Sequence, residues 1–162
     1  MTRSKKIALS IVLPIAVILI VLLSLSLVYG IDILKDAIEH RGWTKIDYCN
    51  DRWDVQIPNA NIKYTFSSCG GFNGDGETYT ICQYSSLPNE FLQDFTSDSK
   101  GEYLEKYNSI STMLQSSKVD KSQLIEPDEN YIWLSKTKNT NNTLLLAYNQ
   151  QTNTLYIIEQ FI

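Results

Sequence analysis

The C-terminal stretch 143-TLLLAYNQQTNTLYIIEQF-161 decides the fold of the polar part of this chain. Two runs rich in β-branched, aromatic and leucine residues, 143–148 and 154–161, flank the polar segment NQQTN. Such a segment between two apolar runs is typical of a hairpin connection. A third run, 131–136 (YIWLSK), precedes them across the polar segment NTNN. The sequence therefore predicts three consecutive strands at the C-terminus.

Two further strands are expected upstream of these three. Residues 61–67 (NIKYTFS) place Ile62, Tyr64 and Phe66 on one face by strict alternation, and 77–84 (ETYTICQY) is a second β-rich run. The loop 69–76 between them contains four of the seven glycines. If the two strands pair about this loop, Phe66 faces Tyr79 and Tyr64 faces Ile81.

Helical periodicity is clearest in residues 101–115, where Tyr103, Tyr107, Ile110 and Leu114 form one stripe. A shorter helix is expected within 87–99 and a juxtamembrane helix within 30–42, whereas 50–59 is expected to be irregular. Trp43 and Tyr48 are interpreted as core residues. The order α-β-β-α-β-β-β, with about five strands, predicts an α+β domain with one antiparallel sheet and helices on one face.

Residues 7–29 (IALSIVLPIAVILIVLLSLSLVY) contain no charged side chain. As a helix these 23 residues would span roughly 34 Å, which exceeds the ~30 Å hydrocarbon core of a bilayer. The basic residues Arg3, Lys5 and Lys6 indicate a cytoplasmic N-terminus. We therefore expect a cytoplasmic tail (1–6), a transmembrane anchor (7–29), a juxtamembrane helix (30–42) and an extracytoplasmic domain (43–162).

A cleaved signal peptide is the competing interpretation of the same run. Signal-peptide apolar regions usually have about 7–15 residues, so the length of this run favours an uncleaved signal anchor. The C-terminal domain lies outside the cytoplasm in either case. The localisation expected is the cell membrane, with a single pass and the lipid bilayer as the partner of residues 7–29.

The charge of the chain excludes one large class of partner. Residues 31–162 carry 11 basic and 18 acidic side chains, a formal charge of −7. Nucleic-acid affinity depends largely on cations that neutralise phosphates, so we expect no nucleic-acid partner. A protein or another component of the cell envelope is the partner class that remains.

The three cysteines, Cys49, Cys69 and Cys82, are an odd number in a compartment that permits disulfides. The predicted strand register separates Cys69 from Cys82 by more than a disulfide can span. A bridge would therefore join Cys49 with Cys69 or Cys82. No C-x-x-C motif is present and His40 is the only histidine, so no metal site is predicted.

The loop 70–77 is the most suggestive chemical feature, because oxygen ligands alternate at Asn73, Asp75 and Glu77. This is how a calcium loop begins, but Thr78 and Tyr84 then stand where such a loop needs glycine and glutamate. We therefore favour a glycine-rich hairpin and retain these three residues as candidate ligand-binding residues. No catalytic motif is recognised, and no catalytic residue or cofactor is predicted.

Two segments, 70–77 (GGFNGDGE) and 147–159 (AYNQQTNTLYIIE), resemble small uncharacterised exported or membrane-anchored proteins of low-GC Gram-positive bacteria. Those proteins carry a GGFHGDGE-like loop and a Y-D-x-x-T-N-x-L-Y-Y-Y-E-like terminal hairpin. This chain has Asn73 where histidine is usual and Asn149 where aspartate is usual. The resemblance implies an exported or anchored protein with a terminal hairpin, and it implies no particular activity.

These observations predict a membrane-anchored extracytoplasmic protein whose domain is a non-catalytic binding or accessory module. The abundance of tyrosine and tryptophan is compatible with recognition, although aromatic residues also fill sheet faces. The alternative is an extracytoplasmic hydrolase or thiol enzyme centred on the loop 70–77.

Overall fold

The computed structural model describes residues 21, 24, 29–31, 41–69, 75–128, 130–138 and 141–162. The chain divides into two compact units, Met1–Thr44 and Lys45–Ile162. In the first unit the described residues are helical up to residue 31, and the Ser24 hydroxyl donates to the Val21 carbonyl at 2.8 Å. Nearly all of the predicted anchor (7–29) and juxtamembrane helix (30–42) lie outside the described residues. Within the described part of the chain, no helix has the length and apolarity needed to span a bilayer.

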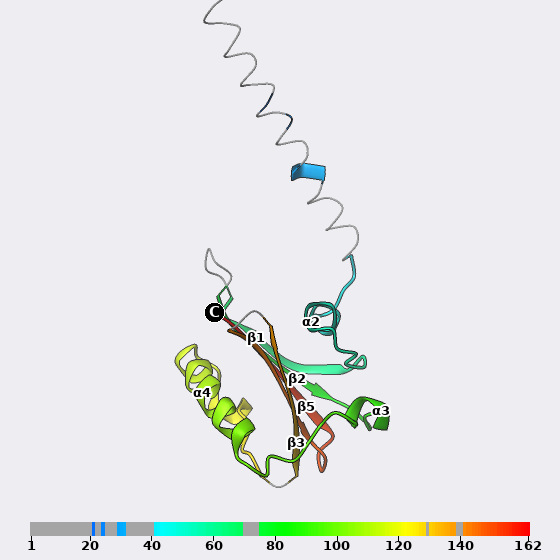
Figure 1. Ribbon diagram of the computed structural model, residues 1–162, viewed down its shortest axis with the longest axis vertical. Coiled ribbons are helices and arrows are strands. Elements are labelled where there is room, and N and C mark those ends of the chain that lie inside the picture. Colours follow the sequence, from blue (N-terminus) through cyan, green and yellow to red (C-terminus); the bar gives the residue numbers. More distant parts are fainter. Residues whose placement is uncertain are drawn as a thin grey trace, which may run out of the picture. The chain divides into compact units, whose positions relative to one another are not determined.

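The second unit contains one five-stranded antiparallel sheet (Figure 1). Its strands are β1 (Asn61–Ser67), β2 (Gly76–Gln83), β3 (Tyr131–Lys138), β4 (Asn142–Asn149) and β5 (Thr154–Phe161). Their spatial order is β1-β2-β5-β4-β3, so the last strand of the chain occupies the centre. All five predicted strands are present, which confirms an α+β domain built on an antiparallel sheet.

The predicted register of the first hairpin is confirmed, since Phe66 pairs with Tyr79 and Tyr64 pairs with Ile81. The expectation that Ile62 shares their face is wrong. The register shifts between Ile62 and Tyr64, and such a bulge reverses the side-chain parity of a strand. Tyr64 and Phe66 therefore pack on one face of the sheet and Ile62 on the other.

The helices are α2 (Lys45–Trp53), α3 (Asn89–Leu92) and α4 (Glu102–Ser116), followed by the 3-10 helix η1 (Lys121–Gln123). Helix α4 confirms the prediction for 101–115, and α3 is shorter than the range 87–99 suggested. The start of the segment predicted to be irregular, 50–53, belongs to α2. Tyr48 lies on α2 with 42% of its surface exposed, so its assignment to the core is wrong, whereas Trp43 is half-buried.

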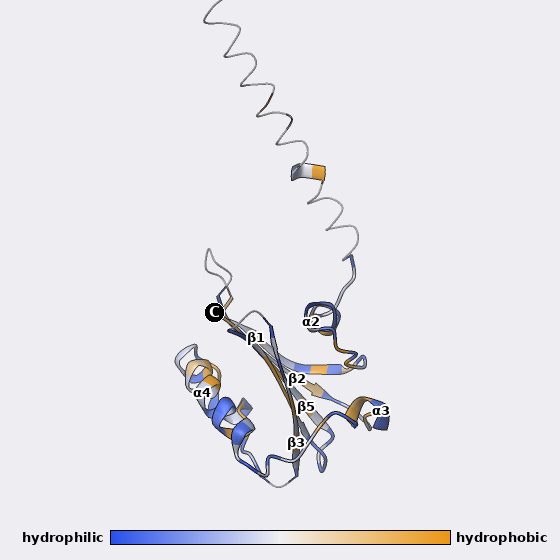
Figure 2. Cartoon of the chain, viewed as in Figure 1, coloured by the Kyte–Doolittle hydropathy of each residue, from blue (hydrophilic) through white to orange (hydrophobic). Residues whose placement is uncertain are grey.

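The prediction that helices cover one face of the sheet is also wrong. Figure 1 shows α4 on one side of the sheet and α2 and α3 on the other. Each side has its own buried cluster, and β4 supplies both, with Leu145 and Ala147 in the α4-side core and Leu144, Leu146 and Tyr148 in the α2-side core. The physical reason is the unbroken apolar run of β4, because a strand without alternation has two apolar faces that both need cover. Figure 2 shows hydrophobic positions on α3, α4 and parts of the sheet.

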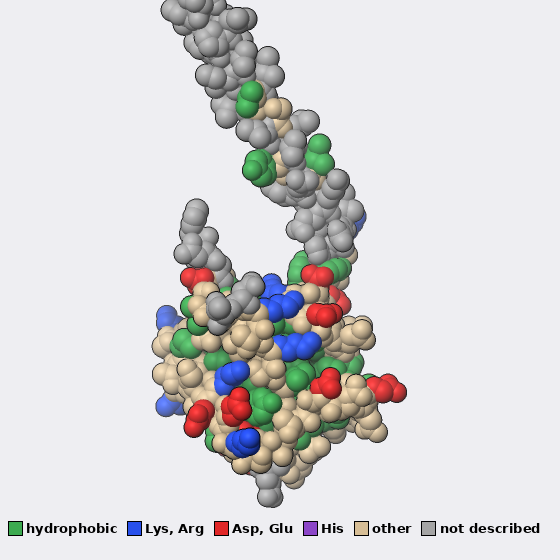
Figure 3. All heavy atoms as spheres, in the orientation of Figure 1, with side chains coloured by type: hydrophobic (Ala, Val, Ile, Leu, Met, Phe, Trp, Pro, Cys, Tyr) green, Lys and Arg blue, Asp and Glu red, His purple; other side chains and the backbone are tan. Residues whose placement is uncertain are grey.

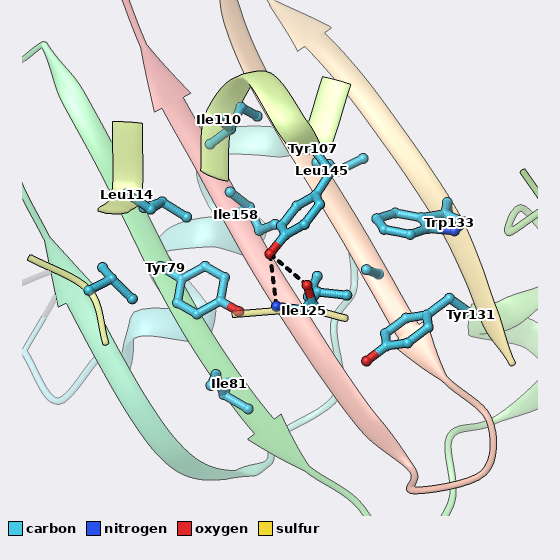
Figure 4. Packing of buried hydrophobic residues seen from close by; sticks show 12 residues of the cluster. Tyr79, Ile81, Tyr107, Ile110, Leu114, Ile125, Tyr131, Trp133, Leu145 and Ile158 are labelled. Carbon is cyan, nitrogen blue, oxygen red and sulfur yellow. Dashed lines mark hydrogen bonds between the residues drawn. The ribbon is translucent and has the colours of Figure 1, made fainter. Parts of the chain in front are cut away.

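The α4-side core contains buried tyrosines whose hydroxyls have partners (Figure 4). The Tyr107 hydroxyl accepts from the Ile125 amide at 2.8 Å and donates to the Ile125 carbonyl at 3.2 Å. The Tyr79 hydroxyl donates to the Gln123 carbonyl at 2.7 Å. The Tyr107 bonds hold the segment between α4 and β3 against the helix, and the Tyr79 bond holds it against the sheet. The bonds also satisfy these buried hydroxyls, which would be costly without partners.

Candidate functional site: a pocket between helix α2 and the sheet

A pocket of ≈ 440 Å³ opens between α2 and the β1, β2 and β5 strands, within the second unit. Helix α2 contributes one stripe of side chains at i, i+3, i+4 and i+7 spacing. This stripe consists of Lys45, Tyr48, Cys49 and Arg52. The sheet and the end of β1 contribute the rest: Thr65, Phe66, Ser67, Cys69, Thr78, Thr80, Ile157, Glu159 and Phe161.

Hydroxyl groups form the β1–β2 part of the pocket wall. Thr65 pairs with Thr80 and Ser67 pairs with Thr78 across the two strands, and the Thr65 and Thr80 hydroxyl oxygens lie 3.3 Å apart. The bulge at Lys63 determines this arrangement, because it turns Thr65 and Ser67 towards the α2 side. Farther along the same side, the sheet is apolar and belongs to the core.

Glu159 is the central polar group of the pocket, and it is only 7% exposed. Its Oε1 atom accepts from the Trp53 indole Nε1 at 2.7 Å and from Arg52 Nη1 at 3.0 Å. Its Oε2 atom accepts from the Thr78 hydroxyl. A buried carboxylate is tolerated when its oxygens are paired in this way, so the three donors fix the carboxylate in place.

Arg52 is held from two sides. Its guanidinium forms an ion pair with Glu159, and its Cζ atom lies 4.8 Å from the centre of the Phe161 ring. The second contact has the geometry of a cation–π interaction. The side chain is 46% exposed, so the rest of the guanidinium faces the pocket opening and solvent.

Two of the three thiols are unsuited to nucleophilic chemistry. Burial raises the pKa of the Cys49 thiol, and the nearby Glu159 carboxylate raises it further. Burial likewise raises the pKa of Cys82 to about 12. Because the thiolate is the reactive species, both groups are inert near neutral pH. Cys69 is half-buried and lines the pocket.

All three cysteines are free thiols in the structure. Cys49 and Cys69 line the same pocket, while Cys82 lies in the α2-side core. The pairing of Cys49 with Cys69 or Cys82 stays a prediction.

Of the candidate loop residues, Asp75 and Glu77 are described, and neither lines the pocket. Asn73 lies outside the described residues, and Asp75 is exposed. The Glu77 carboxylate accepts from the Ser68 hydroxyl at 2.7 Å, and the same hydroxyl accepts from the Glu77 amide at 2.7 Å. Gly76 has φ +140°, and a Cβ atom there would lie 2.8 Å from the Ser68 hydroxyl oxygen. These contacts close the β1–β2 hairpin.

Among the residues that the structure describes, no group of three or more His, Cys, Asp or Glu side chains is arranged to hold a metal ion. His40 lies outside these residues. On the face drawn in Figure 3, basic, acidic and apolar side chains are interspersed.

The sequence reasoning missed Arg52, Trp53 and Glu159 as a set. One signal for Glu159 was present, since it interrupts the apolar alternation of β5 at a position that shares a face with Leu155 and Ile157. A charge on a buried face needs a partner, but the partner is 107 residues away in sequence.

Comparisons with protein-family models, with curated proteins and with solved structures find no match to this chain.

Proposed function

We propose that this chain is a single-pass membrane protein, anchored by residues 7–29, whose C-terminal domain is a non-catalytic binding module outside the cytoplasm. The pocket between α2 and the sheet is its binding site. The uncharged 23-residue run and the basic N-terminal tail support the anchor and its orientation. A partner or ligand from the cell envelope fits this location.

The observation that carries the binding role is the state of the polar groups in the pocket. Both oxygens of Glu159 are engaged by neighbouring donors, and burial keeps the Cys49 thiol protonated. Neither group is poised to exchange a proton with a substrate or to attack one. The pocket volume falls within the range of about 300–1,000 Å³ that is usual for small-molecule sites.

A thiol enzyme is the second candidate, and the position of Cys69 favours it. This thiol is half-buried and lines the pocket. A thiol nucleophile also needs a base that deprotonates it. An activity that depends on Cys69 would distinguish the two candidates.

The test uses the full chain in phosphatidylcholine nanodiscs and a library of fluorinated fragments read by ¹⁹F NMR. Ser67→Trp places a bulky ring at an exposed position of the pocket wall, and Lys63→Trp places the same ring on an exposed position of β1 that does not line the pocket. We expect fragments that bind the native chain and Lys63→Trp, and that Ser67→Trp weakens by at least about tenfold. Turnover of peptide, ester or cell-wall substrates that is lost in Cys69→Ser would overturn the proposal, as would the absence of fragments sensitive to Ser67→Trp.

A further inference from the structure

The pocket is locally cationic within an acidic domain. Its lining contains two basic side chains, Lys45 and Arg52, and one carboxylate, Glu159, which gives a formal charge of +1. Residues 31–162 as a whole carry −7. Asp47 and Asp51 belong to the same helix but are not part of the pocket lining. A concave site whose net charge is positive concentrates anions, so this pocket favours a negatively charged ligand.

Arg52 is oriented in advance to receive that anion. The Glu159 carboxylate and the Phe161 ring fix the position of its guanidinium, and neither contact covers the whole group. A guanidinium has five N–H groups that can donate hydrogen bonds. Among the described residues, Arg52 donates one such bond, from Nη1 to Glu159. The remaining donors form a planar fork that suits a carboxylate, and little side-chain entropy is lost on binding because the group is already held.

The rest of the pocket suits an organic body attached to the anion. Phe161 provides apolar surface beside the guanidinium, and Ile157 and Cys49 also line the pocket. The hydroxyls of Thr65 and Ser67 belong to residues that are exposed, and a hydroxyl can donate to an anionic oxygen. The ligand therefore meets cations, hydroxyl donors and apolar side chains within one pocket.

The net charge of the lining separates a monoanion from a dianion. A single carboxylate balances the formal +1 of the pocket. A phosphate dianion would leave one negative charge uncompensated close to the buried Glu159 carboxylate, and charges in such sites repel strongly. We infer that this pocket binds a small organic carboxylate that has an apolar body. The inference rests on the proposed binding function and specifies its ligand class.

The probe is 4-fluorobenzoate, observed by ¹⁹F NMR with the full chain in phosphatidylcholine nanodiscs. Its neutral analogue of nearly the same shape is 4-fluorobenzamide, and empty nanodiscs correct for partition into lipid. We expect 4-fluorobenzoate to bind at least about tenfold more tightly than the amide, because only the carboxylate carries a charge that pairs with Arg52 and offers two oxygens to its planar donors. Inorganic phosphate should compete less well than acetate at equal concentration.

Three substitutions locate the binding. Lys45→Gln removes an exposed cation, so the substitution should not disturb the fold. It should weaken 4-fluorobenzoate binding about 2–5-fold. Arg52→Gln should weaken it by about tenfold or more, with circular dichroism as the check on folding. Lys63→Gln is the matched control, since it removes an exposed lysine of β1 outside the pocket, and it should leave Kd unchanged.

Equal binding of the acid and the amide would overturn the inference, and so would acid binding that Lys45→Gln and Arg52→Gln do not weaken. Failure of 4-fluorobenzoate to bind would overturn it as well. In each case, neutral fragments that still bind in a manner sensitive to Ser67→Trp would leave the proposed binding function standing. The loss of all such fragments would remove both.

Discussion

At the scale of single residues, Glu159 links the fold to the pocket. It lies on the central strand and joins β2 to α2 through Thr78, Trp53 and Arg52. Glutamine at this position keeps the size of the side chain but removes the negative charge, so the hydrogen bonds from Trp53 and Arg52 to a charged acceptor become weaker bonds to a neutral one.

We therefore expect Glu159→Gln to lower the free energy of unfolding by about 1–3 kcal/mol. The ion pair itself contributes little of this, because the Arg52 side chain is 46% exposed and solvent screens it. Urea unfolding of the full chain in nanodiscs, followed by tryptophan fluorescence, measures the change. The control Glu126→Gln alters an exposed carboxylate and should change stability by less than about 0.5 kcal/mol. Equal effects of the two substitutions would contradict the role of Glu159.

Gly76 is the second residue on which the structure depends. Its φ of +140° disfavours any side chain, and a Cβ atom would lie 2.8 Å from the Ser68 hydroxyl oxygen and 2.9 Å from the Cys69 amide nitrogen. Gly76→Ala should therefore destabilise the domain by about 2 kcal/mol or more.

Gly101→Ala is the matched comparison for this prediction. Gly101 has φ +73° but open space around its Cα atom, so alanine there meets only backbone strain of about 1 kcal/mol. The same urea titration compares the two variants. A Gly101→Ala variant as unstable as Gly76→Ala would show that the close approach to Ser68 is unimportant.

At the scale of elements, α2 is held by contacts from other parts of the fold. Two lysines of β3 donate to carbonyls at its C-terminal end: Lys136 Nζ to Asp54 at 2.6 Å and Lys138 Nζ to Arg52 at 2.6 Å. A cation at the C-terminus of a helix is favourable because it meets unpaired carbonyls and the negative end of the helix dipole.

Lys136→Met keeps the aliphatic stem and removes the cation, so it should weaken α2 by about 0.3–1 kcal/mol. Amide hydrogen exchange should then become faster in α2 and remain unchanged in α4. Lys100→Met, which alters an exposed lysine in a turn, serves as the control. Exchange in α2 that is the same in both variants would refute a stabilising role for the cation.

The strands could be predicted from the sequence, whereas the contacts of α2 could not. Strand alternation in 61–67 and the apolar runs near the C-terminus identify all five strands, and the first hairpin register follows from them. The segment KIDYCNDRW has few strong helix formers, and α2 gains its stability from contacts of Trp53 and from the β3 lysines. Long-range contacts of this kind leave no local pattern. For the same reason the Arg52–Glu159 pair could not be predicted, and neither could the bulge that directs Thr65 into the pocket.

At the scale of the whole molecule, one sheet supports two cores. Buried thiol and phenol groups in these cores make the stability of the domain dependent on pH. Burial raises the pKa of Cys82 from 9.0 to about 12 and that of Tyr107 from 10.0 to about 12. At a pH between the ordinary pKa of each group and about 12, the unfolded chain has released the Cys82 and Tyr107 protons, whereas the folded chain retains them. Because the folded state binds more protons, stability falls as the pH rises from about 9 to about 12, and these groups change nothing below pH 9.

The urea midpoint should therefore be level between pH 7 and pH 8.5 and should fall steadily from pH 9 to pH 11. The Cys82→Ala variant should have a shallower decline, since one of the retained protons is gone. A midpoint that does not change up to pH 11 would show that these side chains titrate normally in the folded chain.

The central claim is that this domain lies outside the cytoplasm and presents an open pocket. Labelling of Cys69 in intact bacterial cells with a membrane-impermeant charged maleimide tests this claim most directly, because Cys69 lines the pocket while Cys49 and Cys82 are buried. The account predicts that, after treatment with a membrane-impermeant reductant that opens any disulfide at Cys69, one thiol per chain is labelled before the membrane is permeabilised, and that Cys69→Ser abolishes the labelling. Labelling that requires permeabilisation, or that persists in Cys69→Ser, would contradict it.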